Sequence, residues 1–225
     1  NNGGVNGPLT FNVSGNTFNE QITINAVPGA SSTRTVTFNG SGTANTILNF
    51  NGAGAPNSHT VRLSGSQWIT FQQMTLRGGG TTANWVVHIL NNAANCTIKN
   101  CRIQLTGTAT TSTSQNYNAV VINASTTSVL TTTQVTTTNI IIDSNVIEGG
   151  YYGVLLSCWN YNGMNFIRGN TISNVFYNGI YAYYYLGYKV LNNTINMRTG
   201  FSGSRGFESF VSTPNNPLFN EISGN

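Results

Sequence analysis

The chain has 225 residues, of which 39% are hydrophobic and only 6% are charged, and its net charge is +4. Periodic Ile and Val within this polar sequence argue against disorder, and the length is sufficient for one sizeable core. The nine Lys and Arg residues form no run, so we expect no nucleic-acid binding, which needs a clustered basic footprint. We also expect no transmembrane segment, because no stretch of 18 apolar residues occurs.

Residues 1–60 alternate short runs of strand-forming residues with turns of Gly, Ser, Asn and Pro. We predict strands here at residues 9–13, 21–24, 34–38 and 47–50.

A six-residue pattern, apolar-x-x-Asn-x-Ile, then occurs three times. Its copies begin at Ile142, Ile167 and Val190, so successive starts are 25 and 23 residues apart. Such a period is typical of a solenoid, in which each repeat buries its apolar side by stacking on its neighbours. Degenerate copies occupy residues 71–76 and 98–103, and residues 222–225 begin a further copy.

The pattern predicts two short strands joined by a bend at Asn145, Asn170 and Asn193. Ile, Val and Thr favour strands, and Asn tolerates the left-handed conformation that a tight bend requires. Stacked coils would bring these amides to about 4.8 Å from one another, within reach of a hydrogen-bonded ladder. Each bond of the ladder would contribute about 1 kcal/mol.

Another strand is expected between the copies, often opening with Gly, at residues 85–89, 119–122, 153–156, 179–182 and 206–210. Two or three short strands per turn of 23 to 27 residues predict an all-β, single-domain right-handed parallel β-helix, in which every crossover is the next face of the coil. We assign one domain to residues 1–225, with opening coils at 1–60 and regular coils at 61–225.

Several segments carry a resemblance to a known family: residues 6–13 (NGPLTFNV), 21–24 (QITI), 26–30 (AVPGA), 35–38 (TVTF) and 66–71 (SQWITF). They resemble the opening coils of pectate-lyase-like β-helix domains in large secreted or surface proteins of Bacteroidetes-type bacteria, usually exported by the type IX system. The resemblance implies an extracellular or cell-surface location and contact with secretion machinery. It also implies an amino-terminal cap helix, which this chain lacks. The incomplete copy at residues 222–225 indicates later coils, so we expect the chain to be a fragment that lacks both.

Two polar tracts, residues 106–116 and 124–138, lengthen the interval between the copies at Ile98 and Ile142 to 44 residues. Loops of this length on a regular scaffold are either mobile or functional. Both interpretations stay open: solubilising loops, or loops that contact a ligand or partner.

Nine of the ten tyrosines fall within residues 151–188. If Ile180 and Ala182 face the core, the alternation of a strand turns Tyr181 and Tyr183 outward. Exposed rings suit sugar binding or protein contact. The alternative is a structural role, in which the rings form a face that another coil or domain covers. The candidate ligand-binding residues are Tyr151, Tyr152, Trp159, Tyr181, Tyr183 and Tyr185.

The residues that catalysis on this fold would require are sparse. Glycoside hydrolysis needs paired carboxylates and calcium needs several oxygen ligands, but the five acidic residues are spread along the chain. Asp143 falls in a column with Lys99 and Arg168, which predicts a surface ion-pair ladder. His88 and Glu208 both point outward but lie about four coils apart. We therefore predict no catalytic residues, no metal site and no cofactor.

Cys96, Cys101 and Cys158 are an odd number without metal-ligand spacing. We expect no disulfide framework, and we expect Cys96 and Cys101 to be small buried hydrophobes.

These observations favour a non-catalytic extracellular module, a rigid rod for adhesion or for contact with a glycan or another cell-surface polymer. One alternative is a polysaccharide lyase or glycoside hydrolase whose acidic site lies outside this chain. The other is a pure spacer or secreted cargo without a ligand.

Overall fold

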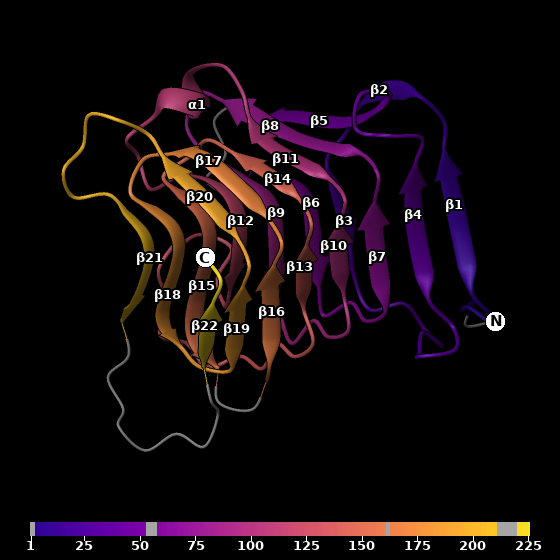
Figure 1. The fold of residues 1–225 in the computed structure, drawn as a ribbon. Coiled ribbons are helices and arrows are strands. Elements are labelled where there is room, and N and C mark those ends of the chain that lie inside the picture. The colour runs from indigo at the N-terminus through magenta and orange to yellow at the C-terminus, as the bar shows by residue number, and fades with distance from the viewer. Residues whose placement is uncertain (1–2, 53–57, 161–162, 211–219) are drawn as a thin grey trace.

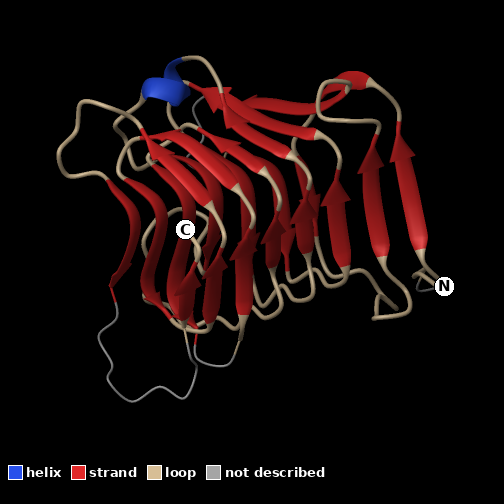
Figure 2. Ribbon diagram, viewed as in Figure 1, coloured by secondary structure: helices blue, strands red, loops and turns tan. Residues whose placement is uncertain are grey.

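The computed structural model describes residues 3–52, 58–160, 163–210 and 220–225, and it is a right-handed parallel β-helix. Three parallel sheets run along the solenoid, and Figures 1 and 2 show their strands stacked side by side from coil to coil. The predicted fold class is confirmed.

Each coil contributes in turn one strand to each of the three sheets. Sheet A contains β1 (Leu9–Val13), β4 (Val36–Gly40), β7 (Ile69–Gln72), β10 (Thr97–Lys99), β13 (Ile141–Asp143), β16 (Asn165–Arg168), β19 (Tyr188–Leu191) and β22 (Glu221–Ser223). Sheet B contains β2 (Asn16–Asn19), β5 (Thr46–Gly52), β8 (Thr75–Gly80), β11 (Arg102–Leu105), β14 (Val146–Glu148), β17 (Thr171–Val175) and β20 (Thr194–Met197). Sheet C contains β3 (Ile22–Ile24), β6 (His59–Ser64), β9 (Asn84–Leu90), β12 (Tyr117–Asn123), β15 (Tyr152–Asn160), β18 (Asn178–Tyr185) and β21 (Arg205–Phe210).

The core consists of inward columns, in which the same position of successive coils carries an apolar side chain. In sheet A, Phe38 stacks between Phe11 and Phe71, at centroid distances of 5.2 and 4.7 Å. Buried Ile98 and Ile142 continue the same column. Each such side chain stabilises the fold by roughly 1.5 to 3 kcal/mol when it is fully buried.

Glycine at the start of the sheet C strands has a steric cause. A Cβ atom on Gly153 would lie 2.7 Å from Cγ2 of Ile172, and one on Gly179 would lie 2.5 Å from Cγ2 of Ile195. The corner between sheets B and C is therefore too tight for any larger residue at these two positions.

The asparagine ladder is present and is buried. Oδ1 of Asn170 accepts the backbone N–H and the side-chain amide of Asn145, both at 3.0 Å, and Asn193 receives the same two bonds from Asn170. Each Nδ2 also donates to a backbone carbonyl one coil earlier, as Asn170 does to Ile142 at 2.9 Å. Asn225 accepts the last pair of bonds, from Asn193.

The prediction that the ladder asparagines take the left-handed conformation is wrong, because that conformation occurs one residue earlier in each bend. The left-handed positions are Ser144, Gly169 and Asn192, with φ of 55°, 63° and 53°, directly before the three ladder residues. The chain turns where a short side chain is exposed, and the following Asn is thereby aimed into the coil, where its amide bonds both neighbours. Asn145, Asn170 and Asn193 themselves do not have positive φ.

All three cysteines are free and buried, which confirms the prediction for Cys96 and Cys101. Burial raises the pKa of Cys96 to about 11 and that of Cys101 to about 12, and it also raises the pKa of Cys158. The thiol form therefore predominates in the folded protein at neutral pH.

We predict that replacing Asn170 by Ala destabilises the protein by roughly 2 to 4 kcal/mol, because the buried amide and carbonyl groups of Asn145 and Ile142 lose their partner. Urea unfolding monitored by circular dichroism measures the change. Asn196→Ala, on the exposed side of β20, is the matched control and should shift stability by no more than about 0.5 kcal/mol. Equal effects of the two variants would contradict a stabilising ladder.

We also predict that a thiol reagent at pH 8 labels none of the three cysteines within minutes in the native protein, and labels all three in urea. Rapid labelling of any one of them without denaturant would show that its burial is wrong.

Candidate functional site

The outer face of sheet C carries the candidate site. Outward side chains fall in columns along the rod, and two adjacent columns matter here. The first column contains Arg62, His88, Val121, Leu155, Tyr181 and Glu208. The second column contains Asn123, Ser157, Tyr183 and Phe210.

The chain leaves sheet C after Asn123 and crosses this outer face before it returns to the coil. Val129 and Leu130 pack on an apolar patch of the sheet that includes Val121 and Leu155. Trp85 and Tyr152 belong to the same cluster. The predicted loop at residues 124–138 is thus anchored by hydrophobic contact, at the point where the first column is apolar.

Hydrogen bonds hold the start of this crossing segment. Nε of Arg62 donates to Nδ1 of His88 at 3.1 Å, and Nε2 of His88 lies 2.9 Å from Oδ1 of Asn123. Nδ2 of Asn123 in turn donates to the carbonyls of Ser128 and Val129. Since the guanidinium only donates, Nδ1 of His88 is the acceptor and Nε2 carries the proton.

His88 is fully buried, and its ring packs edge-on against Trp85 at a centroid distance of 4.7 Å. Burial, together with the positive charge of Arg62, lowers the pKa of His88 to about 3. The imidazole is therefore neutral at physiological pH. Its role is to connect the sheet to the crossing segment, and four coils separate it from Glu208, as predicted.

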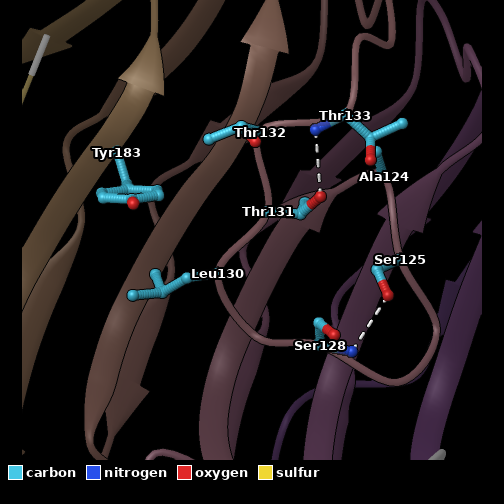
Figure 3. A pocket seen from close by; sticks show the side chains of 8 residues that line it. All are labelled: Ala124, Ser125, Ser128, Leu130, Thr131, Thr132, Thr133 and Tyr183. Atoms are coloured by element: carbon cyan, nitrogen blue, oxygen red, sulfur yellow. Dashed lines mark hydrogen bonds between the residues drawn. The ribbon is translucent and has the colours of Figure 1, made fainter. Parts of the chain in front are cut away.

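Beyond this anchor, the crossing segment and Tyr183 of β18 border an open surface hollow of about 430 Å3. Figure 3 shows the side chains that line it. They are Ala124, Ser125, Ser128, Leu130, Thr131, Thr132, Thr133 and Tyr183. None of the eight is charged, and six of them carry a hydroxyl group.

The hydroxyl groups are of two kinds. Those of Ser125 and Thr131 accept backbone N–H groups of the same segment, from Ser128 at 2.9 Å and from Thr133 at 3.1 Å (Figure 3). These bonds fix the two oxygens and the shape of the loop. Among the described residues, the hydroxyls of Ser128, Thr132 and Thr133 have no hydrogen-bond partner in the protein and are available to a ligand.

Among the described residues, Tyr183 is the aromatic ring that borders the hollow. Phe210 stacks on it from the next coil, at 5.8 Å between centroids and 15° between planes. On the other side, the same column holds Ser157, whose hydroxyl accepts the backbone N–H of Thr131 at 2.9 Å. A serine is too small to cover a phenol ring, so the side of Tyr183 toward the hollow is left open.

Other candidate rings lie elsewhere. Ile180 and Ala182 are buried, which confirms that Tyr181 and Tyr183 point outward, and both rings are half-buried. Tyr152 and Tyr185 are buried in the protein, so ligand contact through these two rings is a wrong prediction. Tyr185 sits in the core, where its hydroxyl contacts Thr137 and accepts a bond of 2.7 Å from Nδ2 of Asn165.

Tyr151 and Trp159 are engaged in ring stacks. Tyr151 stacks on Tyr177 at 5.1 Å, and Tyr177 contacts Phe201 at 5.8 Å, so one ring from each of three successive coils covers this corner. Trp159 stacks on Tyr184 at 5.6 Å. Stacked rings use their faces on one another, so these positions fit the structural alternative that the sequence left open.

Four of the five carboxylates are paired with cations. Asp143 binds Arg168 at 2.9 Å within the predicted column, and Glu148 binds Arg102 at 2.7 Å on the next sheet. Glu221 and Glu208 pair with Lys189 and Arg205. Within the ranges that the structure describes, no three His, Cys, Asp or Glu side chains gather in a way that could hold a metal ion.

Sequence reasoning identified the loop and the ring but did not bring them together. Residues 124–138 and Tyr183 are distant in the chain, and only the register of β12, β15 and β18 places them side by side. The available signal was the apolar pair Val129 and Leu130 inside a polar tract, which marks a segment packed on an apolar surface.

The fold defines the chain as a parallel β-helix protein. No family model matches it, and no curated protein is similar to it in sequence. Among solved structures it is similar to the crystal structure of an alginate lyase from Paenibacillus sp. str. FPU-7, at 11% identity and a TM-score of 0.29, with 96% of this chain and 90% of that chain covered. At these values the likeness assigns neither an activity nor a site.

No helix in the described part of the chain is long and apolar enough to cross a membrane.

We predict that the protein loses stability as the pH falls below about 6.5. The unfolded chain binds a proton at His88 near that pH, whereas the folded chain does so only near pH 3, so the contribution of His88 is complete above pH 6.5 and declines below it. Because unfolding at these pH values takes up about one proton at this group, the free energy of unfolding should fall by up to about 1.4 kcal/mol per pH unit. Urea unfolding at pH 7, 6 and 5 measures it.

His88→Gln is the matched variant, since an amide can accept from Arg62 and donate to Asn123 without titrating. Its stability should depend much less on pH between 7 and 5, because residue 88 no longer titrates. Parallel pH profiles for the two proteins would rule out His88 as the source.

Proposed function

We propose that this chain is a non-catalytic glycan-binding module, with its binding site in the hollow between residues 124–133 and Tyr183. The observation that carries the proposal is the composition of that hollow: one open aromatic ring opposite a wall of hydroxyl groups. Sugar rings present apolar C–H surfaces and hydroxyl groups together, and this pairing of surfaces is complementary to both.

The geometry supports binding because the site is already formed. The crossing segment is fixed by the Arg62, His88 and Asn123 bonds at its start and by Val129 on the sheet. A preformed site loses less conformational entropy on binding than a mobile loop would. No carboxylate lines the hollow, so a lyase or hydrolase would have to act at another place on the protein.

We further propose that the module is extracellular, in a secreted or surface protein of a Bacteroidetes-type bacterium exported by the type IX system. The support is the resemblance of the opening coils, at residues 6–13 and 66–71, to those of such proteins. Antibody labelling of intact source cells tests this location, and labelling only after permeabilisation would contradict it.

On a glycan array, we predict that the native protein binds a defined group of oligosaccharides and that Tyr183→Ala weakens this binding by roughly tenfold, because an aromatic contact of this kind is worth more than about 1 kcal/mol. Phe166→Ala is the matched control, since it removes a half-buried ring from sheet A, on a different face. The control should bind as the native protein does.

Three results would count against the proposal. Absence of any glycan signal would favour the spacer alternative. Equal loss in both variants would point to general destabilisation, which urea unfolding of each variant would reveal. Release of reducing ends or unsaturated products from bound polysaccharides would instead establish the enzymatic alternative.

A further inference from the structure

We infer that the glycan bound in this hollow is uncharged, and that the site discriminates against uronic acid polymers. This inference rests on the proposed function and adds the class of sugar. Its basis is the distribution of charge on the outer face of sheet C, where each nearby arginine is already committed to a partner within the protein.

Three arginines lie on the outer face of sheet C or at its border with sheet B. Arg62 donates to His88, and burial lowers its pKa. Arg198 donates to the carbonyls of Thr110 and Ser112, at 3.3 and 3.0 Å, with its guanidinium over the ring of Phe176.

Arg205 pairs with Glu208 at 3.3 Å, and Glu208 also accepts a bond of 2.9 Å from Asn178. This pair leaves no net charge in the column next to Tyr183. Glu208 instead faces Tyr181, where burial and the negative charge of Glu208 raise the pKa of the phenol to about 12. A carboxylate on a bound sugar would therefore find no cation that is not already paired on the described part of this face.

The groups that do line the hollow fit neutral sugars. A hydroxyl group both donates and accepts, so Ser128, Thr132, Thr133 and Tyr183 can each pair with a sugar hydroxyl in either direction. A carboxylate only accepts, and proteins recognise it best with arginine forks or lysine. The volume of about 430 Å3 lies within the range of small-ligand sites, so the hollow accommodates a short glycan segment.

Isothermal titration calorimetry tests this inference with neutral hexasaccharides of glucose, mannose and xylose and with oligomannuronate and oligogalacturonate of the same length, at low and at physiological salt. We expect at least one neutral series to bind, with a dissociation constant that changes less than about twofold with salt, since no ion pair forms. The uronates should bind at least roughly tenfold more weakly than that series.

Thr132→Lys provides a gain-of-function variant. Thr132 is exposed and its side chain makes no hydrogen bond within the described residues, so the substitution adds a cation without disturbing the fold. It should improve uronate binding several-fold at low salt, and this gain should shrink at physiological salt because the added attraction is screened.

The outcomes separate the two proposals. Tighter binding of uronates than of neutral sugars, lost in Tyr183→Ala, would overturn the selectivity and keep the binding site. Binding of neutral sugars that survives in Tyr183→Ala would overturn the site. Absence of binding by every oligosaccharide would overturn both.

Discussion

Parallel stacking of coils is the constraint on which this structure depends. It places each side chain about 4.8 Å from its counterpart one coil away, because that is the spacing of hydrogen-bonded strands. Every position must therefore tolerate a close neighbour at the same place in the next coil, and where the residue type repeats, the side chains must be able to contact their own kind. Amides do so at Asn145, Asn170 and Asn193 by bonding one another, and aromatic residues do so at Phe11, Phe38 and Phe71 by stacking.

The candidate site arises where this rule is interrupted. In the second outward column of sheet C, Ser157 stands between Asn123 and Tyr183, and the crossing segment uses the space that a larger residue would fill. A column continued by rings would have closed the face of Tyr183, as happens at Tyr151 and Tyr177. The same repeat thus produces both the structural stacks and the one open ring at the hollow.

The repeat made the fold predictable from sequence. The spacing of Ile142, Ile167 and Val190 predicted the coils, their register and the ladder, because these depend on local pattern alone. The bend conformation was assigned one residue late, since the pattern does not show which of two neighbouring small polar residues takes positive φ. The burial of Tyr152 and Tyr185 and the path of residues 124–133 depend on contacts between distant segments, which a single sequence does not specify.

The direction of the ladder bonds has a mechanical consequence. Backbone and amide hydrogen bonds between coils run along the rod axis, from Cys101 to Asn145 and on through Asn170 and Asn193 to Asn225. A tension applied along that axis stretches these bonds directly, and because the coil interfaces lie in series, each of them carries the whole load, shared among the strand pairs of the three sheets.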